Sequence, residues 1–531
     1  MLLLIRLLIA VLCAAAAAAT WSQTSPRFDI LEFVVEGDSV LGAPAIERAV
    51  YPFLGLQRSA ADAEGARKAL EQAYQDAGFL SVSVVLPPQR VDNAGGEVRL
   101  QVVQATVDKL RVTGAEFHLP SKIREGLPSL QPGSVPNFPE MQLELGELAR
   151  ASADREITPI IAAGDRPGTM DVELKVQDSR PLHGSLELNN KQSENTRAGR
   201  LEADLRYNNL FQRGHSLGFG WFYSPSQPDR ADIRTVNYGL PLGGSGDRLT
   251  LSLQHSDSNT PTPLGGSTVS RGNTWRLRWR DELTARDGLP QQALSWGMNL
   301  RDLQDSNRNV AGFDTPAPTV RYPSFVAGYS LDMLDLAGNG GRSSTSLLAE
   351  LTFGLRGTGQ RNVDCYGLVK DQFACKREGA RPDFQVLSLT LSHRQPLGAG
   401  WLLGGRLQLQ LTDAPLIPDE QASYGGVDSV RGFYQGALAA DRGGALRLEL
   451  MAPGWTLLPQ LNLHGVAFAD YAAGGRLSPL PGEDVNAHIA STGLGLRAES
   501  NFGLQATLWW AHVLRGSGRS QRWDLSLRQA F

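Results

Sequence analysis

The sequence predicts small α+β modules followed by a transmembrane antiparallel β-barrel of about 16 strands. Three observations support this fold class. The chain opens on a short apolar leader, no later window holds an apolar run long enough for a membrane helix, and residues 181–531 contain many runs in which apolar and polar residues alternate. Because backbone groups in lipid need internal hydrogen-bond partners, a membrane chain without such helices must close its strands into a barrel.

Residues 1–22 are predicted to be a secretory signal peptide. Arg6 precedes a short apolar run, Leu7–Ala19, which ends in small residues. The alternative is a transmembrane anchor, but this run is too short to cross about 30 Å of hydrocarbon as a helix. Cys13 could indicate a lipoprotein, yet Ala10-Val11-Leu12 is a poor lipoprotein signal. We therefore expect an exported chain.

The region that follows is predicted to form two modules, residues 23–105 and 106–180, with the same order of elements. Each has a strand, two helices and two more strands, and this repetition indicates tandem domains. The expected elements are strands 28–37, 81–85 and 97–103 with helices 43–54 and 60–77, and then strands 107–113, 157–161 and 170–176 with helices 121–130 and 139–152.

Residues 181–531 alternate in the way expected of a barrel with lipid outside and water inside. Trp275, Leu277 and Trp279, for example, alternate with three arginines. A water-soluble β-sandwich would also alternate, but its polar face would be open surface. The predicted strands are 182–190, 199–208, 215–224, 232–242, 249–258, 273–283, 292–304, 325–333, 345–355, 383–395, 400–413, 444–453, 461–472, 488–499, 504–514 and 521–531.

The chain ends on an alternating strand that closes with Phe531. A terminal Phe on such a strand resembles the outer-membrane assembly signal, which implies the barrel assembly machinery as a partner during biogenesis. Long surface loops are expected near residues 305–322, 356–381 and 415–442, because no alternating run covers them.

The loop over residues 415–442 carries the most specific motif of the chain. Val430-Arg431-Gly432-Phe433 lies at its centre, and Tyr424-Gly425-Gly426 comes before it. With Gly436, Asp441, Gly443 and Glu449, this segment resembles the VRGF/Y loop of the two-partner secretion transporters, the haemolysin secretion and activation type within the superfamily of outer-membrane barrels with periplasmic POTRA domains.

The resemblance implies that this loop folds back into the lumen, where Arg431 pairs with an aspartate of an F-x-D-x-G motif. Phe468 and Asp470 match that motif, whereas Ala472 replaces its glycine. The period of two independently places Asp470 on the lumen side, because it shares parity with polar residues of the same strand. The alternative is that Arg431 and Asp470 are two solvated lumen charges, which would hold little energy.

The same resemblance identifies both modules as POTRA domains. The first carries the matching residues Tyr74, Gly78, Phe79, Pro87 and Gln89. Sheet edges can bind an extended chain as an extra strand, so such modules could capture a polypeptide. The alternative is a rigid spacer or a scaffold that faces peptidoglycan.

Cys365 and Cys375 are expected to form a disulfide, because an exported chain can oxidise them and no further Cys or His lies near enough to suggest a metal site. The alternative is two free thiols. We find no catalytic constellation, no metal site and no phosphate-binding loop, and therefore predict neither an enzyme nor a bound cofactor. The net charge of -4 and the absence of a basic cluster argue against nucleic acid as a partner.

The predicted function is export across the bacterial outer membrane, with the POTRA domains in the periplasm. An unfolded exoprotein would be captured there, pass through the barrel and fold outside. The alternatives are an insertase for barrel proteins, which shares the loop motif but usually has more POTRA domains, and a passive porin. Many family members have an N-terminal plug helix, which does not fit here because the first module already begins at Phe28. The sequence does not identify the exoprotein or the oligomeric state.

Overall fold

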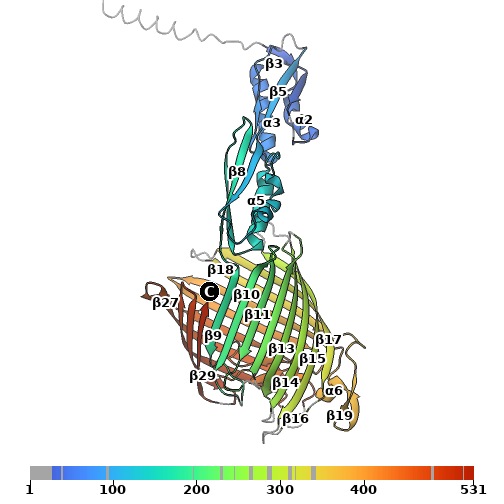
Figure 1. Ribbon diagram of the computed structural model, residues 1–531, viewed down its shortest axis with the longest axis vertical. Coiled ribbons are helices and arrows are strands. Elements are labelled where there is room, and N and C mark those ends of the chain that lie inside the picture. The colour runs from blue at the N-terminus through green and yellow to red at the C-terminus, as the bar shows by residue number, and fades with distance from the viewer. Residues whose placement is uncertain are drawn as a thin grey trace, which may run out of the picture. The chain divides into compact units, whose positions relative to one another are not determined.

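The fold comes from a computed structural model, whose ribbon is drawn in Figure 1. The chain divides into two compact units, one ending at Ser179 and the other running from Arg180 to Phe531. The predicted signal peptide lies outside the described residues, and no helix among those residues is long and apolar enough to span a membrane. The structure describes residues 27–531 except 38–39, 91–94, 195, 228–230, 244–245, 262–266, 284–289, 309–313, 317, 337–341, 480–483 and 518.

The first module of the N-terminal unit packs helix α3 (Ala60–Asp76) on a three-stranded sheet of order β2-β5-β4. The helix begins with a capping box between Ser59 and Asp62, and it buries Ala66, Leu70 and Tyr74 against the sheet. The other elements are β1 (Arg27–Ile30), β2 (Glu32–Glu36), α2 (Ala43–Val50), the 3-10 turn η1 (Tyr51–Phe53), β3 (Gly55–Ser59), β4 (Val82–Val85) and β5 (Glu97–Gln104).

Two predicted boundaries in this module are wrong. The single strand expected over residues 28–37 is two strands, because the chain leaves the β1–β3 pair at Leu31 and joins β5 instead. The helix expected over residues 43–54 ends at Val50, and a short strand that was not predicted follows it. Gly55 has a φ of 140°, a conformation open to glycine but not to a helix, so the chain turns there into β3.

The second module repeats this order around a sheet of order β6-β8-β7. Its core is formed by the apolar faces of the sheet and of helix α5 (Phe138–Ala151), with Ile123, Leu127 and Leu130 from the preceding turns. The predicted helix over residues 121–130 is interrupted at Gly126. The remaining elements are β6 (Thr106–Thr113), α4 (Pro120–Glu125), η2 (Pro128–Leu130), β7 (Arg155–Ala163) and β8 (Thr169–Asp178).

The two modules meet where helix α3 ends and helix α5 begins. Gly78 has a φ of 94°, and a Cβ there would lie 2.7 Å from Pro139 Cδ. Asn137 caps both helices, since its side chain donates to Ala77 O at 3.0 Å and accepts from Glu140 N at 3.3 Å. Only glycine fits this junction, which explains Gly78 without reference to ligand binding.

The C-terminal unit is a closed antiparallel barrel of 16 long strands, in agreement with the predicted fold class. Two short strands, β16 and β26, pair beside β15 and β27. The strands are β9 (Leu182–Asn189), β10 (Arg200–Leu210), β11 (His215–Tyr223), β12 (Ala231–Pro241), β13 (Arg248–Pro261), β14 (Ser267–Leu283), β15 (Gln291–Arg308), β16 (Asp314–Pro316), β17 (Val320–Leu336), β18 (Arg342–Phe353), β21 (Gln385–Gly398), β22 (Trp401–Thr412), β25 (Arg442–Met451), β26 (Trp455–Leu458), β27 (Leu461–Gly475), β28 (Asn486–Ser500), β29 (Leu504–Arg515) and β30 (Gln521–Ala530).

Strands β14, β15 and β17 are longer than predicted, and β15 and β17 extend into the two ends of the loop expected over residues 305–322. Their outer ends carry Ser, Asn, Asp and Arg in place of alternating apolar residues, which hid them from a search for lipid-facing patterns. The loop expected over residues 356–381 also has structure, namely β19 (Asn362–Cys365), β20 (Leu368–Asp371) and α6 (Gln372–Lys376).

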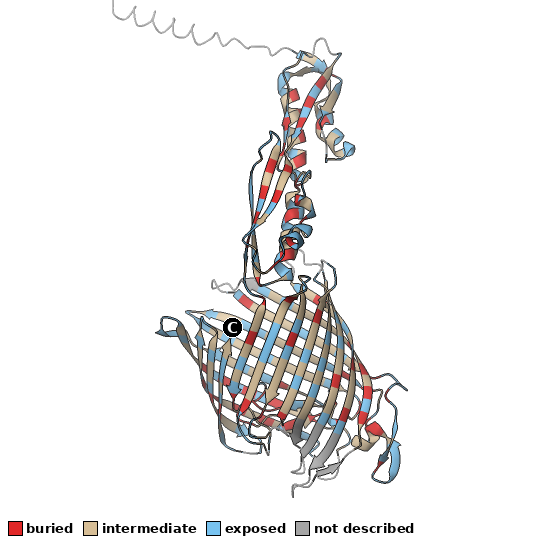
Figure 2. Ribbon diagram, in the orientation of Figure 1, coloured by how far each residue is buried: buried red, intermediate tan, exposed pale blue. Residues whose placement is uncertain are grey.

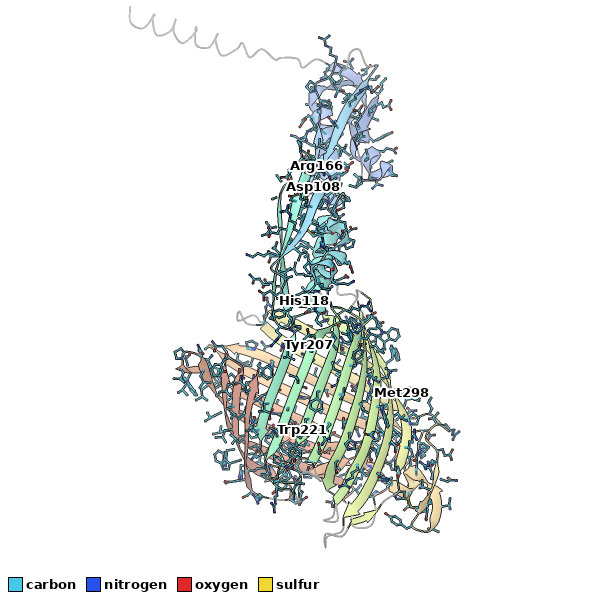
Figure 3. The ribbon with its side chains drawn as sticks, viewed as in Figure 1. Asp108, His118, Arg166, Tyr207, Trp221 and Met298 are labelled. Atoms are coloured by element: carbon cyan, nitrogen blue, oxygen red, sulfur yellow. A yellow bond between two sulfur atoms is a disulfide. The ribbon has the colours of Figure 1, made fainter. Side chains whose placement is uncertain are left out.

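The barrel wall has an apolar outer face and a polar inner face. Trp279, Trp296 and Met298 are 46%, 51% and 40% exposed on the outside, although they are large and apolar. Figure 2 shows the resulting alternation of exposed and half-buried positions over the wall, and Figure 3 labels Trp221 and Met298 on it. This pattern is the one that lipid outside and water inside require.

Strand β30 closes the barrel against β9 through five residue pairs, from Ser526 opposite Asn189 to Ala530 opposite Ser185. Phe531 extends this closure, because its backbone exchanges two hydrogen bonds of 3.0 Å with Gly184. The rim at which β9 begins is called the near rim below, and the rim at which β9 ends is called the far rim.

Candidate functional site: a loop held inside the barrel

The loop between β22 and β25, residues 413–441, is here called the inserted loop. It leaves the far rim and returns into the lumen, where its central residues contact the inner faces of β25, β27 and β29. Strands β23 (Ala422–Tyr424) and β24 (Leu438–Ala440) pair within the loop and bring its two arms together. The glycines Gly425, Gly426 and Gly432 allow the turns between the arms, since each has a φ between 90° and 114°.

Arg431 is the most completely buried large side chain of the inserted loop, with 0% of it exposed. Its guanidinium donates from Nε to Asp470 Oδ2 and from Nη2 to Asp470 Oδ1, both at 2.7 Å. Its backbone N–H donates to the same carboxylate at 3.0 Å. Arg431 and Asp470 therefore form a bidentate pair, the contact expected from the sequence.

A second carboxylate and two aromatic rings complete the surroundings of Arg431. Nη1 donates to Glu449 Oε1 at 2.7 Å. The guanidinium carbon lies 3.7 Å from the centre of the Phe468 ring and 4.6 Å from that of Trp509. The faces of both rings cover the guanidinium. They exclude water from its charge and add cation–π interactions.

The alternation of β27 explains why Phe468 and Asp470 both reach the loop. They are two residues apart, so they face the lumen together while Ala469 faces outward. Ala472, which replaces the motif glycine, shares this face and is fully buried in the small apolar cluster formed by Val430, Phe433 and their neighbours. The methyl group thus fits without displacing the loop.

Gly432 allows the loop to approach the wall closely. A Cβ at this position would lie 3.1 Å from the Cβ of Ala511 on β29, and its φ of 90° disfavours other residues. Each of the four motif residues therefore has its own role. Arg431 forms the charged contact, Val430 and Phe433 fill the apolar cluster, and Gly432 allows the loop to come close enough to the wall for these contacts.

The base of the inserted loop is held by a separate ion pair. Arg377 donates from Nη1 and Nη2 to the two carboxylate oxygens of Asp441, at 2.6 Å and 2.8 Å. Asp441 is fully buried and also accepts the backbone N–H groups of Leu416 and Leu477, at 3.1 Å and 2.6 Å. Three loops of the far rim therefore meet on one carboxylate.

Arg377 belongs to the loop of residues 354–384, which is here called the disulfide loop. Cys365 and Cys375 are joined in it, with their Cα atoms 5.7 Å apart. Its Phe373 packs with Leu416 and Ile417 of the inserted loop in a buried apolar cluster. The disulfide links the two ends of a segment that includes β20 and α6, the elements that precede Arg377.

A third contact holds the start of the inserted loop. Glu420 accepts from the hydroxyl of Tyr322 at 2.7 Å and lies 3.3 Å from Arg301 Nη1. Arg301 also donates to the backbone oxygen of Asp419 at 2.7 Å. Charged groups thus attach the loop to the wall at its start and its tip, and to the disulfide loop at its end.

The POTRA motif residues of the first module serve its packing. Tyr74 is fully buried, and its backbone oxygen accepts from Phe79 N at 2.9 Å. The Gln89 amide donates to Arg99 O and accepts from Arg99 N, both at 2.8 Å, so it pairs with β5 as a further strand residue would. The backbone oxygen of Pro87 accepts from the same amide at 3.4 Å.

Asp178 terminates the N-terminal unit in a buried cluster of hydrogen bonds. It accepts the backbone N–H groups of Glu116, Phe117 and His118 at 2.8–2.9 Å and contacts His118 Nδ1 at 3.1 Å. Figure 3 labels His118 at this place. Burial favours the neutral acid, but these hydrogen bonds outweigh it and lower the pKa of the Asp178 carboxyl.

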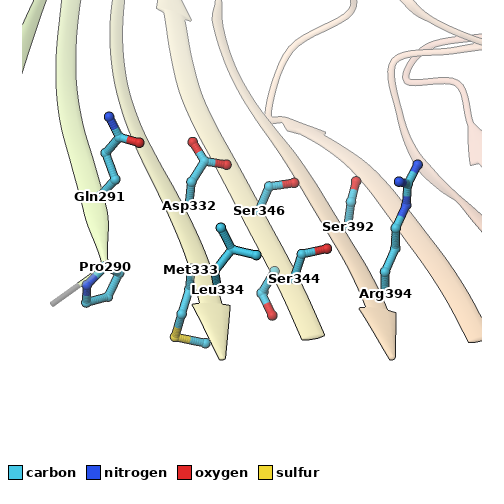
Figure 4. A pocket seen from close by; sticks show the side chains of 10 residues that line it. Pro290, Gln291, Asp332, Met333, Leu334, Ser344, Ser346, Ser392 and Arg394 are labelled. Carbon is cyan, nitrogen blue, oxygen red and sulfur yellow. The ribbon is translucent and has the colours of Figure 1, made fainter. Parts of the chain in front are cut away.

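A cavity of about 680 Å³ opens at the near rim beside strands β15, β17, β18 and β21. Figure 4 shows Gln291, Asp332, Ser346, Ser392 and Arg394 on these four strands. The cavity is bordered mostly by polar side chains, and none of its lining residues belongs to the inserted loop.

Comparison with known proteins identifies the family. The model of the haemolysin secretion/activation proteins ShlB/FhaC/HecB matches residues 168–498, which is more than half of the chain. The chain belongs to this family. Its members are two-partner secretion transporters, which export exoproteins across the outer membrane. The model of the ShlB-type POTRA domain matches residues 28–105.

Individual relatives support this family assignment. The outer membrane transporter CdiB of Escherichia coli O6:K15:H31 is 25% identical over 447 residues, which cover 81% of this chain and 70% of that protein. The heme/hemopexin transporter protein HuxB of Haemophilus influenzae strain 86-028NP is 21% identical over 413 residues, which cover 75% and 67%.

Solved structures show the same fold. CdiB from Escherichia coli superimposes with a TM-score of 0.65 at 20% identity, covering 97% of this chain and 92% of that one. CdiB from Acinetobacter baumannii gives 0.58 at 17% identity, covering 96% and 91%. The barrel of this family member therefore lies in the outer membrane with its POTRA region in the periplasm, and because β9 follows that region, the near rim is the periplasmic one.

Proposed function

We propose that this chain exports an unfolded exoprotein through its barrel and that the inserted loop closes the lumen between export events. The observation that carries this proposal is the burial of Arg431 between Asp470, Glu449 and two aromatic rings. A buried charge with this many specific partners defines one position of the loop, because any other position would remove from the buried Asp470 the arginine that it binds.

Capture of the exoprotein is assigned to the POTRA region, with residues 106–180 as its second POTRA module. Among the strands that the structure describes, β2 and β4 pair only with β5 in the first module, and β6 and β7 pair only with β8 in the second. An extended polypeptide can add to such an edge through backbone hydrogen bonds, which require no particular sequence. This mode of capture suits a long unfolded substrate.

Passage then begins at the near rim, where the polar cavity of about 680 Å³ lies. Release of the inserted loop would widen the path towards the far rim. Folding outside makes the exit irreversible, because a folded domain cannot return through the lumen. The chain needs no catalytic group for this cycle.

The barrel itself is proposed to reach the membrane through the barrel assembly machinery. Phe531 supports this proposal, since its ring is 68% exposed at the closing strand while its backbone completes the pairing with Gly184. The aromatic side chain is therefore free for recognition although its backbone is already used in the fold.

The test compares a strain that lacks this chain with one in which it is restored. We expect one large protein to disappear from the medium and its unfolded form to collect in the periplasm. Outer-membrane barrel proteins should keep their levels. A general fall in those barrels would instead indicate an insertase, and a change in small-solute uptake with an unchanged set of secreted proteins would indicate a porin.

A further inference from the structure

The inner face of strands β13–β15 carries five arginines, Arg248, Arg276, Arg278, Arg280 and Arg301, which are here called the arginine wall. Strand pairing places them together. Arg248 lies opposite Arg280, Ser252 lies opposite Arg276, and Asn299 lies on the other side of Arg276. Met298, labelled in Figure 3, is exposed on the outer face of β15, so its neighbours Gly297 and Asn299 face the lumen with these arginines.

The arrangement costs stability. Arg248 and Arg280 are direct cross-strand neighbours with the same charge, and such pairs are unfavourable. Three arginines also follow one another on a single face of β14, about 7 Å apart along the strand. Folding alone does not require these charges, because Gln or Thr would suit a water-filled lumen equally well.

Most of the arginine wall is held by neutral groups. Arg276 donates to Gln254 Oε1 at 2.9 Å, Arg278 to Asn299 Oδ1 at 2.8 Å, and Arg248 to Ser216 Oγ at 3.2 Å. Among the residues that the structure describes, none of these three has a carboxylate within ion-pair distance. Their guanidinium groups are therefore oriented by neutral acceptors and form no direct ion pair with a described carboxylate.

Two carboxylates do approach the other members of the wall. Glu282 lies 3.7 Å from Arg280, in a pair that is 41% and 24% exposed, and Glu420 of the inserted loop lies 3.3 Å from Arg301. The second contact comes from the loop rather than from the barrel. When the inserted loop leaves, Arg301 loses this carboxylate and the wall gains one more free charge.

The opposite side of the lumen differs. There Arg431 and Arg447 contact Glu449, at 2.7 Å and 3.0 Å, and Arg522 contacts Asp524 at 2.8 Å. These three arginines, which hold or adjoin the inserted loop, are thus paired with acids. Arg248, Arg276 and Arg278, on β13 and β14, have no such acidic partner among the described residues.

We propose that the arginine wall binds acidic segments of the polypeptide in transit and guides them along β13–β15. A planar guanidinium offers two parallel donors to a carboxylate, so the wall recognises Asp and Glu side chains without recognising a sequence. The neutral partners that fix Arg248, Arg276 and Arg278 reduce the side-chain freedom that binding would cost. The same charges make the open lumen selective for small anions. This inference rests on the proposed export function.

Close packing around Arg278 fixes the position of its side chain on the barrel wall. A Cβ on Gly297 would lie 2.6 Å from Arg278 Cδ and 2.4 Å from Leu277 O. The glycine therefore leaves the room in which the Arg278 stem lies flat on the wall, with Nη1 donating to Leu277 O at 3.1 Å. The charged end is held at a fixed height above β15.

The test measures binding of two labelled unstructured peptides to the purified full chain by fluorescence anisotropy at low salt. One peptide contains Glu, Gly and Ser, and the other contains Lys in place of Glu. We expect the acidic peptide to bind more tightly, with the difference shrinking in high salt because of screening. The variant Arg276→Gln, Arg278→Gln, Arg280→Gln should bind it roughly tenfold more weakly, since several hydrated ion pairs are lost.

A matched control removes three exposed arginines from helices of the periplasmic unit, as Arg48→Gln, Arg124→Gln, Arg150→Gln. It changes the net charge equally and should leave binding unchanged. Equal loss in this control, or equal binding of both peptides to the wild-type chain, would overturn the inference. Heat-modifiable mobility verifies that each barrel is folded, and Arg278→Gln alone replaces the triple variant if that one is not.

A second readout is the reversal potential of the open lumen in a salt gradient across a planar bilayer. The wild-type value should indicate anion selectivity, and the triple variant should shift it towards zero. Cation selectivity of the wild-type chain would contradict the inference. Failure of this readout leaves the export function standing if secretion is normal. An unchanged set of secreted proteins in the deletion strain, with intact peptide binding, would reject export and keep the anion-binding site.

Discussion

The contact between Arg431 and Asp470 allows a quantitative prediction about the position of the inserted loop. Replacing Arg431 by Ala removes two side-chain hydrogen bonds of 2.7 Å to Asp470 and one to Glu449, and it leaves both carboxylates without their main cation. Loss of one partner of a buried ion pair costs about 3–5 kcal/mol. At 1.4 kcal/mol for each factor of ten, the equilibrium between the inserted and the released loop should shift by roughly two to three and a half powers of ten.

A cysteine in place of Val430 reports this shift, because Val430 is fully buried beside Arg431. On intact cells a membrane-impermeant maleimide should label Val430→Cys slowly in the wild-type background and rapidly with Arg431→Ala. Secretion of the exoprotein should fall strongly in the Arg431→Ala variant. Arg431→Lys should restore little, since an ammonium cannot reproduce the planar fork.

A double-mutant cycle separates pairing from independent effects. Asp470→Ala should resemble Arg431→Ala, and the double variant should be no worse than either, because the two side chains act as one unit. Arg406, an exposed arginine on the inner face of β22, supplies the control, and Arg406→Ala should behave as the wild type. Fully additive losses, or slow labelling of Val430→Cys in the Arg431→Ala variant, would refute the pairing.

Three further predictions concern other parts of the chain. Arg377→Ala, or reduction of the Cys365–Cys375 disulfide, should increase proteolytic cleavage within residues 413–441 on intact cells, because the pair of Arg377 with Asp441 holds the base of that loop. The double variant Cys365→Ser, Cys375→Ser should abolish the response to reductant, and a response that persists in it would contradict the role given to this disulfide. Deletion of residues 28–105 should stop secretion while the barrel still shows heat-modifiable mobility, and normal secretion would reduce this POTRA domain to a spacer. Asp178→Ala should lower the unfolding temperature of the periplasmic unit within the full chain at neutral pH but not well below pH 3.9, since a carboxyl whose folded pKa is lowered stabilises the fold only where it is ionised. Asp165→Ala, at an exposed position, is the control. An equal effect of Asp178→Ala at both pH values would contradict this origin.

Much of the barrel could be predicted because lipid on one side and water on the other impose a period of two on every spanning strand. The same parity placed Asp470 on the inner face before any contact was known. It could not show how far a side chain reaches. Glu449 and Trp509 also lie on inner faces, but their contacts with Arg431 depend on the depth to which the inserted loop enters.

Arg377 shows a second limit of sequence reasoning. Its partner Asp441 is 64 residues away, and the two meet only because the disulfide loop packs on the inserted loop. No periodic pattern crosses such a distance between loops. The outer ends of β14, β15 and β17 were missed for a related reason, since strands beyond the lipid no longer need an apolar face.

Three arginines of the wall lay within one predicted strand, and their alternation with Trp275, Leu277 and Trp279 was part of the evidence for the barrel. The proposed binding of acidic segments could be inferred only once the hydrogen-bond partners of these arginines were known. Neutral acceptors on β11, β13 and β15 are brought beside the arginines by strand register, which the sequence does not state.

The central claim is that a polypeptide crosses the membrane through this lumen. A photo-crosslinking amino acid at Ser252, on the inner face of β13 beside Arg276, tests it in cells during export. The account predicts a covalent adduct between this chain and the secreted exoprotein, and no such adduct from Leu251, which is 51% exposed on the outer face. Continued secretion with adducts from Leu251 alone, or from neither position, would contradict passage through the barrel.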